Sequence, residues 1–168
     1  GHESSVQALA FVPRSASLVS GGADKTVRLW KVSGGALVRT YRGHEDLVSA
    51  VAVSSETGYL ASASLDGAIR IYSTASGRTV RALRGHSERV GALAFSPNGA
   101  ILASASHDGT VRLWEARRGR PVRTLVIPGG PVRSLAYALD GRILAIGGED
   151  GTLRLWDATA AAPAKERD

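Results

Sequence analysis

The sequence contains no cysteine, which excludes disulfide bonds and thiolate metal sites. It has no run of 18 apolar residues, so a transmembrane helix is not expected. The opening residues, GHESS, lack the apolar stretch of a signal peptide, and we therefore expect a cytoplasmic protein with no membrane partner. Methionine is absent as well, which favours a processed product, an engineered repeat protein or a piece of a longer protein.

Signals for helices, phosphate loops and metal sites are also missing. No segment keeps the 3.6-residue apolar period of a helix, so we expect almost no helix. Glycine pairs occur at 34–35 and 129–130, but neither precedes a helix and a lysine as in a phosphate-binding loop. His2, His44 and His86 lie too far apart in sequence for the short spacing of metal ligands. We therefore expect no cofactor and no metal.

The composition is that of one folded domain. The chain has 168 residues, of which 43% are apolar and 21% charged, enough for a core and too few charges for a disordered chain. Its net charge is +6, carried by 18 arginines and only 3 lysines. Such a basic balance raises the possibility of nucleic-acid binding, which the positions of the arginines must decide.

A repeat of 42 residues organises the whole chain without insertion or deletion. Its four copies are most alike in the stretches SGGADKTVRLW, SASLDGAIRIY, SASHDGTVRLW and IGGEDGTLRLW. Asp24 thus recurs as Asp66, Asp108 and Asp150. The repeat predicts four structural units with the boundaries 1–42, 43–84, 85–126 and 127–168.

Each unit is expected to form four strands. In the third unit these are 90–97, 101–106, 110–114 and 121–125. Asp108-Gly109 suits a tight hairpin, because Gly accepts the positive φ angle that such turns need. Both faces of the strands carry apolar residues, many of them alanine, which predicts small sheets stacked face to face around an axis. The expected fold class is all-β.

The Gly-His steps at 43–44 and 85–86, the SASxDG turn and the RLW strand before Asp157 together resemble the WD40 repeat family. The resemblance covers the whole chain and implies a β-propeller with four four-stranded antiparallel blades. Since WD40 propellers mostly have seven or eight blades, we expect half of an eight-bladed ring that closes as a homodimer, or a fragment of a larger propeller. An open half exposes the apolar faces of its end blades, which favours self-association. The weakest strand is expected to be the outer strand of the fourth blade, at 162–166.

The resemblance further implies a hydrogen-bonded tetrad of His, Ser or Thr, Asp and Trp in each blade. In the second blade, Tyr72 stands where Trp is usual. In the fourth, Pro128 and Ile146 replace His and Ser, so we expect Asp150 to cap its turn and Trp156 to pack by its ring. The expected tetrad residues are His2, Ser20, Asp24, Trp30, His44, Ser62, Asp66, Tyr72, His86, Ser104, Asp108, Trp114, Asp150 and Trp156.

Ser106, His107 and Asp108 place the three residue types of a hydrolase triad side by side. Triad members are recognised by their spatial roles and not by adjacency in sequence. Asp108 also recurs in every unit, which a single catalytic site does not require. We therefore interpret this stretch as framework, with His107 alone free to differ between blades, and we expect no catalytic residue and no enzyme activity.

Eight basic residues occupy two positions of the repeat, one residue at each position in every unit. They are therefore spread around the expected ring and form no single stripe. They are Arg28, Arg70, Arg112 and Arg154, and then Arg39, Arg81, Arg123 and Lys165. The second set also protects exposed strand edges from pairing. A basic nucleic-acid-binding propeller therefore remains only as an alternative.

The rim that carries the Asp turns is the expected binding face, because WD40 propellers commonly bind partners there. Residues just before each turn and just after each Gly-His step differ between units, while the framework repeats. We expect a protein–protein interaction scaffold for other proteins or peptides; the alternative is an engineered or excised repeat protein that assembles only with itself. We expect two exposed leucines, Leu47 and Leu65, and the pair Arg89 and Arg133 to be the anchors of binding. The expected contact residues are Gln7, Leu47, Ser49, Leu65, Arg89, His107, Arg133 and Glu149.

Overall fold

The computed structural model describes residues 1–159, which form fifteen β-strands and one short 3-10 segment, Ser33–Gly35. The prediction of an all-β fold with almost no helix is confirmed. The strand predicted at 162–166 lies outside the described residues.

Consecutive strands pair antiparallel, which divides the described chain into four sheets, or blades. The first blade has β1 (Val6–Val12), β2 (Ser17–Gly22), β3 (Val27–Lys31) and β4 (Leu37–Tyr41). The second has β5 (Val48–Val53), β6 (Tyr59–Ser64), β7 (Ile69–Ser73) and β8 (Thr79–Leu83). The third has β9 (Val90–Phe95), β10 (Ile101–Ser106), β11 (Thr110–Glu115) and β12 (Arg120–Val126). The fourth has β13 (Val132–Tyr137), β14 (Ile143–Gly148) and β15 (Leu153–Asp157) within the described residues.

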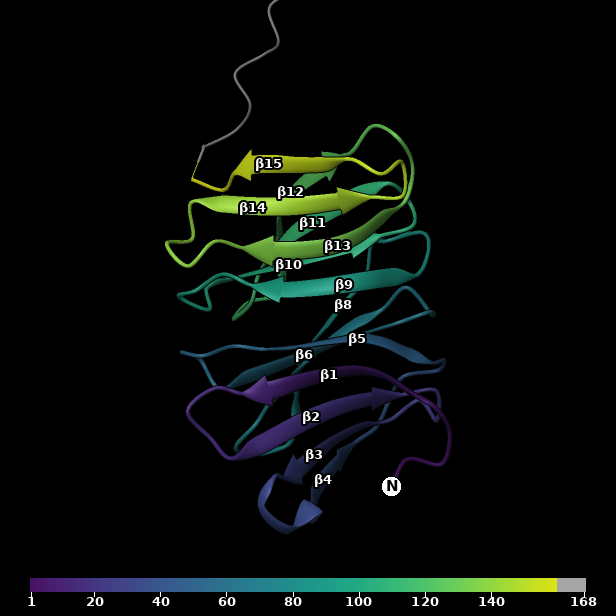
Figure 1. Ribbon diagram of the computed structural model, residues 1–168, viewed down its shortest axis with the longest axis vertical. Helices are drawn as coiled ribbons and strands as arrows, with labels where there is room; N and C mark the ends of the chain where they lie inside the picture. Colours follow the sequence, from purple (N-terminus) through teal and green to yellow (C-terminus); the bar gives the residue numbers. More distant parts are fainter. Residues whose placement is uncertain (160–168) are drawn as a thin grey trace, which may run out of the picture.

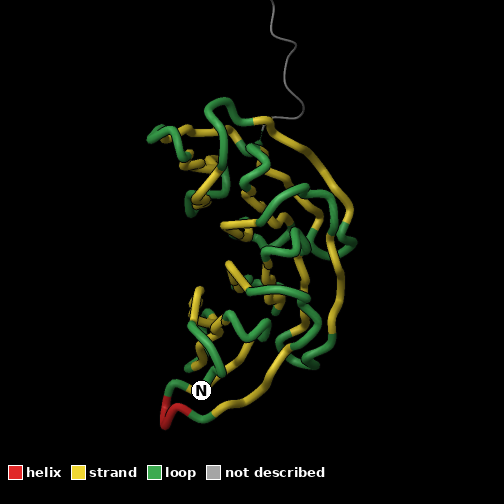
Figure 2. The backbone as a smooth tube through the Cα atoms, turned by 90° about the vertical axis from the view of Figure 1, so that its right-hand side faces the viewer, coloured by secondary structure: helices red, strands yellow, loops and turns green. Residues whose placement is uncertain are grey.

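The blades stand side by side along an arc. The first strand of each blade contacts the first strand of the next, so β1, β5, β9 and β13 follow one another through the molecule (Figure 1). Seen from the side, the arc is open, with a blade free at each end (Figure 2). The shape is therefore a propeller sector with two end blades.

The hydrophobic core consists of three clusters, one at each junction between neighbouring blades. The central cluster joins the second and third blades and includes Ile71 and Leu102, both fully buried. Ala61 and Ala103 are also completely buried, as expected where two sheets approach each other closely. A blade therefore buries its faces only against its neighbours.

The hairpin between the second and third strands follows from the Asp-Gly pair. Gly109 adopts φ 77°, a conformation that suits glycine, while the backbone N–H of Thr110 donates to the Asp108 carboxylate at 2.9 Å. In the first blade Lys25 takes this place and adopts φ 66° without being a glycine. Each such turn carries its preceding residue to the same rim of the arc, which we call the top face.

Candidate functional site: the top-face cavity and its framework

The tetrad of the third blade forms one continuous hydrogen-bonded chain beneath the top face. The Trp114 indole N–H donates to the Ser104 hydroxyl at 2.8 Å, and Ser104 Oγ lies 2.8 Å from His86 Nε2. On its other side, His86 Nδ1 lies 2.8 Å from the Asp108 carboxylate. Because the carboxylate only accepts, the His86 proton belongs on Nδ1, which leaves Nε2 to accept from the serine.

The first two blades show the same arrangement with different completeness. In the first, His2 lies 2.9 Å from Asp24 and 2.6 Å from Ser20, which also accepts from the Trp30 indole at 2.7 Å. In the second, His44 Nε2 lies 2.7 Å from the Ser62 hydroxyl, whereas its Nδ1 is 3.5 Å from Asp66. The ring of Tyr72, which replaces the Trp, packs 5.0 Å from the ring of Tyr41. The second tetrad is accordingly looser than the other two.

The fourth blade keeps only the ends of the tetrad. Asp150 accepts from the backbone N–H and the hydroxyl of Thr152, at 3.0 and 2.7 Å, and so caps its turn. The Trp156 indole nitrogen is buried and has no hydrogen-bond partner among residues 1–159, and the Arg123 guanidinium lies over the ring at 4.8 Å from its centre. Trp156 therefore contributes through its ring, and Asp150 contributes through its turn.

The buried tetrads make folding stability depend on pH in two ranges. Burial lowers the pKa of His44 and His86, outweighing the nearby carboxylates that raise it. Burial raises the pKa of Asp108, but hydrogen bonds from Thr110 and His86 outweigh it and lower this pKa to about 2.

We therefore predict that stability falls in two steps as the pH is lowered. Below a pH of about 6.5, the unfolded chain binds protons on these histidines more readily than the folded chain does, so the free energy of unfolding decreases. Below about 3.9 the unfolded chain also protonates the aspartate, and this contribution is lost as the pH falls towards about 2. Urea denaturation followed by tryptophan fluorescence at pH 8, 6.5, 5, 4 and 3 measures both steps. Constant stability from pH 8 to 5 would contradict the histidine contribution.

A repeated backbone hydrogen bond fixes the rim of the top face. In every blade the residue before the turn Asp donates its N–H to a carbonyl on the segment that enters the first strand. The four pairs, donor first, are Ala23 to Ser5 at 2.8 Å, Leu65 to Leu47 at 3.0 Å, His107 to Arg89 at 3.1 Å and Glu149 to Pro131 at 2.9 Å. The two variable positions of each blade are thus held next to each other.

A β-bulge interrupts the first strand of every blade at the same repeat position. Pairing between the first two strands shifts at Gln7, Ser49, Gly91 and Arg133. A bulged residue leaves the regular ladder and is turned away from the alternation of the strand. All four bulged residues line one cavity on the top face.

The top-face cavity has a volume of about 270 Å³ and collects side chains from all four blades. Seven of the eight contact residues expected from the sequence line it, and Gly91 is the eighth lining residue. The remaining expected residue, Glu149, accepts a hydrogen bond from Arg133 at 2.7 Å. Leu47 and Leu65 are partly buried in the cavity wall, so the expectation of two exposed leucines is corrected.

The two arginines of the cavity wall differ in their partners, because Arg133 is paired with neighbouring side chains and Arg89 is not. Arg133 is held between the Glu149 carboxylate and His107 Nε2, at 2.7 and 3.0 Å. Burial, together with Arg89 and Arg133, lowers the pKa of His107, in agreement with a neutral ring that accepts from the guanidinium. The hydrogen bond from Arg133 lowers the pKa of Glu149. The exposed guanidinium of Arg89 makes no hydrogen bond or ion pair with any described residue.

The adjacent Ser106, His107 and Asp108 point to three different environments. Ser106 Oγ donates to the carbonyl of Arg89 at 2.9 Å, His107 meets Arg133, and Asp108 meets His86. None of the three pairs with another in the order that nucleophilic catalysis needs. Within residues 1–159, no group of three or more His, Asp or Glu side chains is placed to hold a metal ion. In the same part of the chain, no helix is long and apolar enough to cross a membrane.

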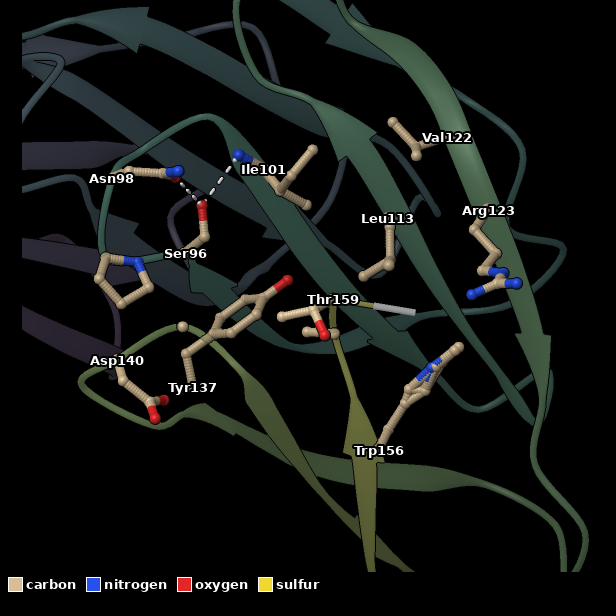
Figure 3. Close-up of a pocket in the computed structure, with 13 residues that line it drawn as sticks. Ser96, Asn98, Ile101, Leu113, Val122, Arg123, Tyr137, Asp140, Trp156 and Thr159 are labelled. Carbon is tan, nitrogen blue, oxygen red and sulfur yellow. Dashed lines mark hydrogen bonds between the residues drawn. The ribbon is translucent and has the colours of Figure 1, made fainter. Parts of the chain in front are cut away.

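A larger cavity, of about 580 Å³, lies between the third and fourth blades away from the top face (Figure 3). Tyr137 and Trp156 line it from one side, Leu113 and Arg123 from the other. At the first junction the equivalent arginine, Arg39, donates to the carbonyls of the β7–β8 turn of the next blade at 3.1 and 3.2 Å. Ala158 and Thr159, the repeat equivalents of the Thr74 and Ala75 that accept from Arg39, line this cavity together with Arg123, so we assign it to blade packing. No sequence pattern pointed to it.

The recurring arginines are engaged by the framework. Arg28 Nη2 donates to Asp24 at 3.1 Å, and Arg154 Nη2 donates to Asp150 at 2.8 Å. Arg70 and Arg112 lie against the glycines of their own Gly-His steps. The repeat positions that make the chain basic therefore mostly stabilise turns and blade junctions.

Four small antiparallel sheets packed face to face along an arc, with turn Asp residues bonded to His, define a WD40 β-propeller. The chain belongs to the family described as the IFT122 first beta-propeller, whose model matches residues 5–166. No curated protein matches it.

Two crystal structures of computationally designed proteins are similar to the chain. Ika4 is 31% identical with a TM-score of 0.82, and the match covers 94% of this chain and 93% of that one. Ika8 has the same identity and TM-score, with 94% of this chain and 47% of the Ika8 chain covered. The chain therefore spans about half the length of Ika8.

Proposed function

We propose that the chain is a non-catalytic scaffold that binds a protein or peptide at the top-face cavity. WD40 propellers are in general non-catalytic, and the side chains of the suspected triad diverge, which supports this reading. The observation that carries the proposal is the convergence of variable side chains from four blades on one cavity.

The chemistry of the wall favours an acidic residue next to an apolar one in the bound peptide. Arg89 offers an exposed guanidinium that forms no ion pair with a described carboxylate, whereas Arg133 is already held by Glu149. Leu47 and Leu65 provide an apolar surface beside it. Arginine is among the residue types that most often dominate binding energy, and its bond to a carboxylate is charge-assisted.

Nucleic-acid binding has less support. Phosphate contacts need arginines and lysines free to reach the backbone, whereas Arg28 and Arg154 bond to turn carboxylates and Arg39 bonds to a neighbouring blade.

Peptide display tests the proposal. A random peptide library selected on the immobilised chain is expected to yield sequences in which Asp or Glu stands near an apolar residue. Fluorescence polarisation with an enriched peptide should show at least about 10-fold weaker binding to Arg89→Glu, the loss expected of a charge-assisted contact. Arg117→Glu is the matched control, because Arg117 is exposed on the β11–β12 turn and the charge change is the same. Peptides that bind both variants equally well would refute the site.

A further inference from the structure

The three internal junctions follow one packing rule. Two residues on the first strand of a blade pack against two residues on the third strand of the preceding blade. At the central junction, Leu93 and Phe95 of β9 pack on the cluster that contains Ile69 and Ile71 of β7. At the first junction Val51 and Val53 meet Val27 and Leu29, and at the last Leu135 and Tyr137 meet Val111 and Leu113.

The same repeat positions are exposed at the two ends of the arc. On the first blade, Leu9 and Phe11 are 61% and 69% exposed. On the fourth blade, Leu153 and Leu155 are 71% and 69% exposed. Leu9 and Phe11 are the same residue types as Leu93 and Phe95, which are partly buried at the central junction. The two end faces are therefore the two halves of one ordinary junction, separated at opposite ends of the chain.

We propose that a second copy of this chain covers both end faces, head to tail, and closes the propeller as a two-fold ring. Leu153 and Leu155 of each copy pack against Leu9 and Phe11 of the other, so both junctions are identical. With a second copy in place, the first strand of one blade packs against the third strand of the preceding blade at both new junctions, as it does at the three internal junctions. Head-to-tail contacts leave an apolar face exposed at each end unless the assembly closes into a ring. Two copies related by a two-fold axis form such a closed ring.

Closure also completes the top-face cavity. Gln7 and Arg133 are the first and last of the four bulged residues along the arc. In the ring, the Gln7 of one copy follows the Arg133 of the other, so the row of bulged residues becomes continuous around a central channel. The second copy thus contributes residues to the same cavity wall at both ends of the row.

The mass of the chain in solution, measured by light scattering after size exclusion, tests the ring. The expected value is twice 17.5 kDa at micromolar concentration. Leu9→Asp and Leu155→Lys each remove one face from every junction, so each variant alone is expected at the monomer mass. Their equimolar mixture is expected to return to twice that mass, because one junction is then native and the other pairs Asp with Lys.

Leu139→Asp is the matched control, since Leu139 is 98% exposed on the β13–β14 turn, outside both end faces, and this variant should stay dimeric. Circular dichroism checks that all variants keep their β-structure. A wild-type chain at 17.5 kDa throughout, or an open series of larger masses, would overturn the two-copy ring. A dimer lost in Leu9→Asp but kept in Leu155→Lys would also overturn it, because it indicates that like faces pair.

Discussion

Replacing Ile71 by alanine is expected to lower the free energy of unfolding by about 4 kcal/mol, the middle to upper part of the range for buried Ile-to-Ala changes. Ile71 is fully buried in the cluster between the second and third blades. The substitution removes its contacts and leaves a cavity that two stacked sheets cannot easily close. The central junction also couples the two halves of the arc, so the loss is felt by the whole chain. Urea denaturation followed by tryptophan fluorescence measures it.

Leu155→Ala is the matched control for this prediction. Leu155 occupies the same repeat position two blades later and is 69% exposed in the single chain. Measured in a Leu9→Asp background, which removes the contribution of association, the control is expected to change stability by less than about 0.5 kcal/mol. Equal losses in both variants would contradict the assignment of the junction cores.

Ser104→Ala is expected to cost about 3 kcal/mol of stability. Ser104 is completely buried and bonds to both Trp114 Nε1 and His86 Nε2 at 2.8 Å. Alanine fits the space but leaves two buried nitrogen atoms without a partner, and each such loss costs about 1–3 kcal/mol. The midpoint of thermal unfolding and the urea midpoint should both decrease.

Ser15→Ala provides the comparison for the serine change. Ser15 is exposed and its hydroxyl donates to the Ser17 hydroxyl at 3.0 Å, so the loss of this hydroxyl should change stability by no more than about 0.5 kcal/mol. A cost below about 1 kcal/mol for Ser104→Ala would show that the tetrad contributes little. The fourth blade illustrates the alternative, since Ile146 fills the serine position there and is itself 1% exposed.

The sequence was sufficient for the architecture because its period is unbroken. A 42-residue repeat with Asp-Gly turns fixes strand order and hairpin connections, and the strands of the third unit begin within one residue of the predicted positions. The rim residues could be predicted for the same reason: Leu65 and His107 each directly precede a turn Asp. The repeat thus determined which side chains reach one face.

Contacts between blades could not be predicted in the same way. Arg133 meets His107 across a junction and Glu149 within its own blade, and neither spacing forms a recognisable motif. The bulges were not predicted either, because Gln7 and Arg133 share no property that marks an extra residue. A bulge depends on the local pairing of two strands, which the apolar pattern of one strand does not reveal.

These bulges separate two kinds of evolutionary constraint. The ladder residues on either side of a bulge must keep their size and polarity to pack two neighbouring blades. The bulged residue itself lies outside the ladder, and four unlike types already occupy the position: Gln7, Ser49, Gly91 and Arg133. Substitutions at the bulged position are expected to change the stability of the fold little and to change which partners bind. New specificities can therefore arise on this propeller one blade at a time, while the scaffold stays unchanged.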